Sequence, residues 1–584
     1  MPQNLKNNSI CKYLLIILIL IALFFYTVLF FSKKESYDGD EIWSYGLANS
    51  YYNPFLHNSG TWDNNKDNRY LQNFNTWITG DTFHNYLTVQ ENERFTYDSV
   101  WYNQSADVHP PFYYALLHTI CSFFPDHFSP WFGLFINYIA FMIVMCVLYK
   151  LARQSGSDVF GLVLCTFYAF SAGAEDTYTF IRMYALATAL AVLLFQQIQN
   201  YLFKESKKKL LFLLCITIFS CLTHYYLIVY AFFLTAISEI YLLIKKRWKT
   251  FWSLGLTMLF GVTISVLVFP SMVYHFLYRS GDLSELNLSF SFQGKLIISL
   301  IMQQFMGISL PSYETMFSFY FCSVLVIFAI IFLLLSFIFR REHFATKLLK
   351  RMQCFLKCIY IKSKQIAEKT PYTIQILCFT LICMFLFYTK TLPIASMKTG
   401  SIRYFFPFYP LLCLTLGILL KNVLFFSIHK KSYRHGIVLT FLSLCVICSN
   451  LLATHTFFYT SNPQYGLSLS DLPNDGCYIV TVPIPHAINN FAVELQNKKY
   501  SYFIEENNFT LTDLPDSLLK LPSESSNPVY LLFTDMDVSG NAEKDQSLKD
   551  AWLKQFTTLP YVTRLEVIGQ DVVNGYSVLI YQLQ

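Results

Sequence analysis

Long apolar runs without charged side chains dominate this sequence. The first, residues 13–31, is long enough to cross the roughly 30 Å hydrocarbon core of a bilayer as one helix. Ten more follow, at about 131–150, 158–175, 183–203, 210–224, 225–244, 251–270, 319–339, 372–389, 403–420 and 436–454. Charged residues make up only 14% of the chain, about half the usual share. We therefore predict a polytopic α-helical membrane protein with about eleven spans, which excludes a soluble enzyme and a disordered chain.

The first run has an alternative interpretation as a cleaved signal peptide. It is long, however, and no small-x-small cleavage motif follows it. The next residues are Lys33, Lys34 and Glu35, which are typical of the flank of a retained helix. We therefore expect residues 13–31 to remain as the first span.

Basic segments between the runs predict the orientation. They are Lys150 with Arg153, residues 204–209, 245–249, 340–370, and the stretch from Lys421 to Arg434. The positive-inside rule places all of them in the cytoplasm, together with the N-terminus. The net charge of +6 then reports orientation and not a nucleic-acid partner. We predict a multi-pass protein of the plasma (cytoplasmic) membrane whose C-terminal end is extracytoplasmic.

Two domains are expected. Residues 1–455 form the transmembrane domain, with a long first outer loop at 33–130 and a basic, amphipathic cytoplasmic loop at 340–370. The short apolar pieces 111–124 and 296–310 are expected as juxtamembrane helices at the outer face. Residues 456–584 read as a small extracytoplasmic α/β domain. Its expected strands are 478–482, 529–535, 562–569 and 576–583, and its helices lie near 486–497 and 547–557.

An acidic cluster, Asp38-Gly39-Asp40-Glu41, begins the first outer loop. Carboxylates at the outer mouth of a helix bundle can act as a general base, bind hydroxyl groups or hold a metal ion. The simpler alternative is a solvated acidic turn. No downstream calcium-loop pattern follows, so a divalent metal at Asp40 and Glu41 is the less favoured option, and no cofactor is firmly predicted.

Several cationic or aromatic residues are expected at the same outer face. They are His109, Arg182 with Tyr184, His224 with Tyr225, and Arg403. Each has a simple structural alternative, such as an interfacial histidine or an arginine whose charge reaches the membrane surface. Their shared location favours a site for a lipid phosphate. The spans show no polar run through their middle, which a transporter's binding site would usually have.

Taken together, these motifs resemble the membrane-embedded GT-C glycosyltransferases. The branch includes protein O-mannosyltransferases, the lipid A aminoarabinose transferase and rhizobial galacturonosyltransferase-like proteins. The resemblance covers roughly residues 10–240, with a weaker echo at 400–420. It rests on Asp40-Glu41, the stretch from Asp107 to His118, Tyr149 to Arg153, Arg182-Met183-Tyr184-Ala185-Leu186, Thr223-His224-Tyr225-Tyr226, and Arg403-Tyr404 ahead of Pro407. The chain departs from the family at Phe180, where an acidic residue is usual.

The resemblance implies a polyprenyl-phosphate sugar as donor and an acceptor hydroxyl on a cell-envelope glycan, lipid or protein. Asp40 or Glu41 would be the general base, and His109, Arg182, Tyr184, His224, Tyr225 and Arg403 would bind the donor phosphate or substrate. Two other classes stay open. One is a transporter or flippase for a lipid-linked sugar, and the other is a non-catalytic scaffold that binds cell-wall glycan.

Overall fold

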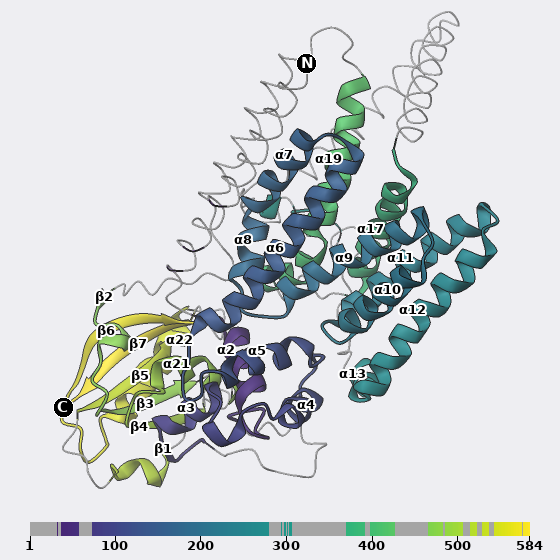
Figure 1. The fold of residues 1–584 in the computed structure, drawn as a ribbon. Coiled ribbons are helices and arrows are strands. Elements are labelled where there is room, and N and C mark those ends of the chain that lie inside the picture. The colour runs from purple at the N-terminus through teal and green to yellow at the C-terminus, as the bar shows by residue number, and fades with distance from the viewer. Residues whose placement is uncertain are drawn as a thin grey trace, which may run out of the picture.

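The computed structural model is mostly helical, with a mixed β-sheet at one end (Figure 1). The structure describes residues 21, 28, 32, 37–57, 73–278, 294, 297–299, 301, 303–305, 370–391, 398–426, 465–482, 485–505, 514–522, 528–535, 542–574 and 576–584. The long helices are α6 (Pro130–Ser155), α7 (Asp158–Ala169), α9 (Tyr184–Phe203), α10 (Lys207–Cys221), α11 (Tyr225–Ile244), α12 (Trp248–Val268), α17 (Tyr372–Thr391) and α19 (Tyr409–Phe426). Shorter helical elements include α8 (Ala172–Thr179), α13 (Ser271–Tyr278) and the 3₁₀ segment η3 (Lys398–Phe408).

Six helical segments in the described ranges are long and apolar enough to cross a membrane. They are Pro130–Ser155, Tyr184–Phe203, Tyr225–Ile244, Trp248–Val268, Tyr372–Thr391 and Ile402–Leu419. Each coincides with a span expected from hydropathy, and together they make this a multi-pass membrane protein. The expected spans 13–31, 319–339 and 436–454 and the basic loop 340–370 fall wholly or almost wholly outside the described residues. Within the apolar piece 296–310, residues 297–299, 301 and 303–305 are described, and they are helical.

One expected span is wrong as a continuous helix. Residues 158–175 divide into α7 and α8, and the break falls at Phe170 and Ser171. Ser171 is the N-cap of α8, where its hydroxyl accepts the backbone N–H of Ala174. Such a cap stabilises a new helix start, because it satisfies a backbone donor that would otherwise have no partner. The hydropathy of the run does not reveal this break.

The first outer loop is largely helical and packs on the ends of the long helices (Figure 1). Its helices are α2 (Gly39–Asn49), α3 (Gly80–Leu87), α4 (Tyr97–Ala106) and α5 (Phe112–Ser122). Helix α5 confirms the short helix expected within 111–124, and it contacts both α2 and α6. Helix α2 is buried along most of its length, so the loop holds its first helix rigidly.

A seven-stranded sheet, to which the tail contributes every strand except β1, has the order β1-β4-β3-β5-β7-β6-β2. Its strands are β1 (Trp77–Thr79), β2 (Tyr465–Gly466), β3 (Cys477–Val482), β4 (Tyr500–Glu505), β5 (Val529–Asp535), β6 (Leu565–Val573) and β7 (Tyr576–Leu583). Strand β3 is parallel to both β4 and β5, and its residues are all buried, as expected for a central strand. The other pairings are antiparallel.

Alternate residues of the central strands point to opposite faces of the sheet and pack into two different hydrophobic cores. On one face, Ile479 and Leu531 pack with helix α22 (Ala542–Phe556), which contributes Trp552. On the other face, Val480 and Leu532 join the core shared with the helical domain. The period of two residues in a strand produces this division. The sheet therefore rests directly on the outer-loop helices.

Strand β1 was not expected from the sequence, because it comes from the first outer loop. Trp77 pairs with Tyr502 and Thr79 pairs with Tyr500 in an antiparallel ladder. Helix α3 follows directly and packs against the short helix α21 (Ala492–Leu495) of the tail. The two extramembrane parts thus share one sheet and one core.

Candidate active site

The N-terminus of α2 carries the acidic cluster, and two of its carboxylates cap the helix. The Asp38 side chain accepts the backbone N–H of Asp40 at 2.9 Å. In return, Oε2 of Glu41 accepts the N–H of Asp38 at 2.8 Å. This reciprocal capping box leaves Asp40 as the carboxylate that is not used in the cap.

Gly39 allows the tail to approach the start of α2 very closely. A Cβ at this position would lie 2.4 Å from Oδ1 of Asn490 and 3.0 Å from Nδ2 of Asn574. The Gly39 N–H donates to Oδ1 of Asn574 at 2.9 Å. Asn574 has a φ of 50°, a left-handed conformation that asparagine tolerates well, at the turn between β6 and β7. The tip of this hairpin therefore touches the helix that carries Asp40.

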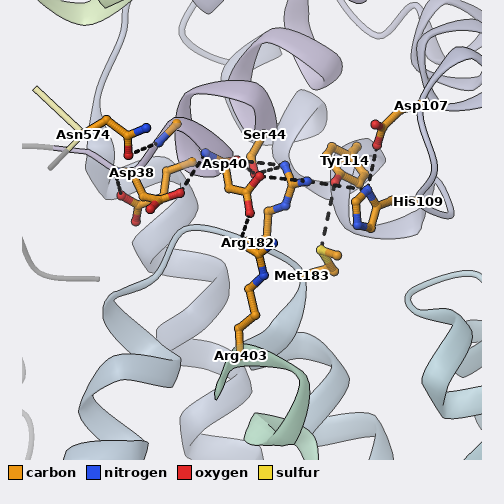
Figure 2. Close-up of polar contacts among 12 residues, drawn as sticks. Asp38, Asp40, Ser44, Asp107, His109, Tyr114, Arg182, Met183, Arg403 and Asn574 are labelled. Carbon is orange, nitrogen blue, oxygen red and sulfur yellow. Dashed lines mark hydrogen bonds and ion pairs between the residues drawn. The ribbon is translucent and has the colours of Figure 1, made fainter. Parts of the chain in front are cut away.

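Asp40 lies between two arginines (Figure 2). One carboxylate oxygen pairs with Arg403, and the other lies 3.7 Å from Nη2 of Arg182. Burial alone would raise the pKa of Asp40, but Arg403 and Arg182 outweigh it and lower the pKa to about 2. Asp40 is therefore ionised at physiological pH. Burial, with Asp40 and Glu41 nearby, raises the pKa of the neighbouring Asp38 to about 7.

Arg182 is the most deeply buried cation of the site, with its side chain only 2% exposed. Its Nη1 donates to the backbone oxygen of Asp40 at 2.8 Å, and its guanidinium lies over the ring of Tyr114. The turn before it is fixed by Glu41, whose Oε1 accepts the N–H of Ile181 at 2.7 Å. Glu41 thereby links the helix of the carboxylate to the turn of the arginine.

His109 lies beside Arg182 at the site. Its Nδ1 lies 2.7 Å from Oδ2 of the buried Asp107 and 3.5 Å from Nη2 of Arg182. An aspartate in this position fixes the orientation of the imidazole. Figure 2 shows His109 and Tyr114 on one side of Asp40, with Asn574 on the other.

His224 and Tyr184 belong to a cluster of aromatic rings near Arg403. The ring of His224 lies 5.3 Å from that of Tyr184 and 6.4 Å from that of Tyr404. Burial, with the side chains of His109, Arg182 and Arg403 nearby, lowers the pKa of His224 to about 3. His224 is therefore neutral at physiological pH and acts as a hydrogen-bonding group, not as a positive charge.

The two arginines have hydrogen-bonding capacity left over. Among the described residues, the buried Nε atoms of Arg182 and Arg403 have no hydrogen-bond partner. A buried guanidinium N–H without a partner is costly, and in native structures it usually awaits a ligand or water. Arginines with spare donors are suited to a phosphate, which accepts several charge-assisted hydrogen bonds at once.

A cavity of about 310 Å³ opens beside Asp40. It is lined by Asp38, Gly39, Asp40, Trp43, Arg403, His486, Ala487, Asn490, Asn574 and Tyr576. Five of these residues belong to the tail, and sequence reasoning missed all five. The Asn574-Gly575 pair is a recognisable hairpin signal, but nothing in the sequence indicates that this hairpin reaches the start of α2.

The predicted site residues are brought together with one exception. Tyr225 points into a separate cluster, where its hydroxyl lies 2.7 Å from Nδ1 of His275. Glu41 lies at the site, but both of its carboxylate oxygens accept backbone N–H groups. In the part of the chain that the structure describes, no group of three or more His, Cys, Asp or Glu residues is placed to hold a metal ion.

We expect Glu41 to support the fold more than the chemistry. Glu41→Ala would leave the buried N–H groups of Asp38 and Ile181 without acceptors and cost about 2–4 kcal/mol of unfolding free energy. Thermal unfolding of the detergent-solubilised protein should show a clearly lower midpoint. Glu91→Ala, which removes an exposed glutamate with its own arginine partner, is the control. Equal midpoints for the two variants would contradict the structural role.

Comparison with known proteins gives a likeness of fold. No known family model matches the chain, and no curated protein matches it. Two crystal structures of ArnT from Cupriavidus metallidurans are similar. The one bound to undecaprenyl phosphate has 11% identity and a TM-score of 0.39, covering 81% of this chain and 87% of that one. The apo structure has 9% identity and a TM-score of 0.46, covering 96% and 97%.

ArnT is a GT-C aminoarabinose transferase, one of the branches that the motifs resemble. With identities this low and TM-scores below 0.5, the likeness says nothing about the reaction, and the site is interpreted below from its own contacts.

Proposed function

We propose that this protein is a glycosyltransferase that moves a sugar from a polyprenyl-phosphate donor to an acceptor hydroxyl. The observation that carries the proposal is the ionised carboxylate of Asp40 between two arginines whose buried Nε donors have no partner among the described residues. The carboxylate is suited to accept a proton, and the two guanidinium groups are suited to bind a phosphate. The motif resemblance to GT-C enzymes supports the same reaction.

In the proposed reaction, the acceptor oxygen attacks the anomeric carbon of the donor sugar. The new bond is C–O to the acceptor, and the bond that breaks joins the anomeric carbon to the phosphate oxygen. The acceptor proton passes to Asp40, and polyprenyl phosphate leaves with the electron pair. A single displacement of this kind inverts the anomeric configuration. Arg182 and Arg403 neutralise the charge that develops on the leaving phosphate.

The ion pair with Arg403 makes Asp40 a weak base in the unliganded protein, because it lowers the pKa of this carboxyl to about 2. A donor phosphate beside Arg403 would compete for that guanidinium. Since the attraction that stabilises the carboxylate would then weaken, the pKa of Asp40 would rise. Donor binding would thus activate the base in the complex where it is needed.

The proposed topology has about eleven spans, with the N-terminus in the cytoplasm. Domain 1–455 would hold the membrane part and domain 456–584 the tail. The acidic cluster, both arginines and the tail would lie at the outer face of the plasma membrane. Basic segments such as 204–209 and 245–249 support this orientation. The acceptor would be a cell-envelope component.

Mass spectrometry of cell-envelope glycans, with and without this protein, tests the proposal. We expect the loss of a single sugar from one class of glycan, lipid or protein, and the accumulation of its polyprenyl-linked donor. A transporter of lipid-linked sugar would instead trap the intact donor on the cytoplasmic side. A glycan-binding scaffold would leave the sugar composition unchanged.

A further inference from the structure

The tail side of the cavity carries polar groups that the protein itself does not use. Asn490 is only 7% exposed, and within the described ranges its amide makes no hydrogen bond. The same holds for the Tyr576 hydroxyl, the Nδ2 group of Asn574 and the ring nitrogens of His486. Trp43 adds an indole Nε1 that is buried and without a described partner. Of these groups, Asn490 and the Trp43 indole N–H are buried, Asn574 and Tyr576 are half-buried, and His486 is exposed. Buried polar groups normally have partners, so the two buried groups indicate that this wall of the cavity (Trp43, His486, Asn490, Asn574 and Tyr576) binds a ligand.

The chemistry of the wall selects the kind of ligand. Two amides, a phenol and an imidazole can both donate and accept hydrogen bonds, as vicinal hydroxyl groups do. The ring of His486 lies 6.0 Å from that of Trp43, so an apolar surface is adjacent. Polar groups that fix orientation beside aromatic surface are typical of small-molecule sites. A carbohydrate offers both hydroxyl groups and C–H faces.

The size and charge of the cavity limit which ligand it can bind. The cavity volume of about 310 Å³ lies at the lower end of the roughly 300–1,000 Å³ found for small-molecule sites. Arg403 also lines the cavity, but it is paired with Asp40. Among the described residues, no lysine or arginine of the tail lines this wall, which favours a neutral sugar over an anionic one.

We propose that this wall binds a neutral carbohydrate, and that this carbohydrate is the acceptor of the reaction. The inference rests on the proposed function, because it takes Asp40 as the base. Arg182 and His109 lie on the far side of Asp40 from Asn574 (Figure 2). A base between the phosphate-binding side and the carbohydrate side is placed to take a proton from an acceptor hydroxyl.

Saturation-transfer NMR on the full chain in nanodiscs tests the binding site. The probes are the methyl glycosides of glucose, galactose and mannose, with methyl glucuronide and a serine-containing peptide for comparison. We expect at least one neutral glycoside to bind in preference to the glucuronide and the peptide. Asn490→Ala and Tyr576→Phe should each weaken its binding about tenfold, which is the loss of one good hydrogen bond.

Two matched variants control for general damage to the tail. Asn497→Ala removes an exposed asparagine of the same domain, and Tyr465→Phe changes an exposed tyrosine of strand β2. Both should bind the glycoside as the wild type does. No neutral glycoside binding to the wild type, preferential binding of the glucuronide or the peptide, or unchanged binding in Asn490→Ala and Tyr576→Phe would each overturn the inference.

Failure of this inference is distinguishable from failure of the proposed function. If the wild type transfers sugar but the wall variants bind and use acceptor normally, only the carbohydrate site is wrong. If the wild type transfers no sugar from a polyprenyl-phosphate donor, the proposed function is wrong, whatever the wall variants bind. Transfer at the wild-type rate by Asp40→Asn and Arg403→Gln would refute only the roles given to these two residues.

Discussion

Asp40→Asn is expected to abolish sugar transfer, with a loss of at least about 10³-fold in rate, within the range typical of a missing general base. Asparagine keeps the shape of the side chain but cannot accept the proton. The change also removes the negative charge that competes for Arg182 and Arg403. Polyprenyl phosphate should therefore bind the variant at least as tightly as the wild type. Transfer from a radiolabelled donor and binding of polyprenyl phosphate are the two measurements.

The chain offers a close control for this change. Asp81 follows Gly80 at the start of α3, as Asp40 follows Gly39 at the start of α2, but Asp81 is exposed. Asp81→Asn should retain full activity. Both proteins should insert into the membrane and elute as single species. Wild-type transfer by Asp40→Asn would contradict the base assignment, and weaker lipid binding would contradict the competition between carboxylate and phosphate.

Arg403→Gln should reduce sugar transfer by about 10²- to 10³-fold, the usual cost of losing one donor to a developing negative charge. Arg403 pairs with Asp40 in the unliganded protein and has a further buried donor without a partner among the described residues. Its loss should raise the pKa of Asp40 but leave the departing phosphate poorly neutralised. The measurements are transfer rate and the affinity for polyprenyl phosphate, and both should fall.

Arg403→Lys separates charge from geometry. Lysine keeps the positive charge but has no planar fork of donors, so we expect partial recovery of lipid affinity and little recovery of rate. Arg153→Gln is the control, because Arg153 forms an exposed ion pair with Asp158, and such pairs contribute little. Full activity in Arg403→Gln would show that this arginine does not serve the leaving group.

Hydropathy predicted six membrane-length helices well, because burial in lipid leaves a simple signature. The expected span 210–224 corresponds to the 15-residue helix α10 and is not one of these six. The spans ending near Ser155, Phe203 and Ile244 agree with their expected ranges to within a few residues. The break at Ser171 was missed, because one capping hydroxyl decides it and the average polarity of the run is unaffected. Strand β1 was missed, because three residues become a strand only through pairing with β4.

The sequence predicted the charged residues of the site but not the long-range contacts that hold them. Topology alone places Asp40, His109, Arg182 and Arg403 at the same ends of the helices, and the structure brings these four side chains together. Contacts over long sequence separation were not predictable. The hydrogen bond between Gly39 and Asn574 joins residues far apart in the chain, and no local pattern announces it. The role of Glu41 in holding the turn at Ile181 was hidden in the same way.

The central claim is that a glycosidic bond is made at Asp40. The most direct measurement uses the purified protein in vesicles, a synthetic polyprenyl-phosphate donor labelled in its sugar, and a cell-envelope extract as acceptor. We expect the label to enter the extract with an inverted anomeric linkage and free polyprenyl phosphate to appear in equal amount. With Asp40→Asn we expect neither product. Movement of the intact labelled donor across the bilayer, with no new glycosidic bond, would contradict it.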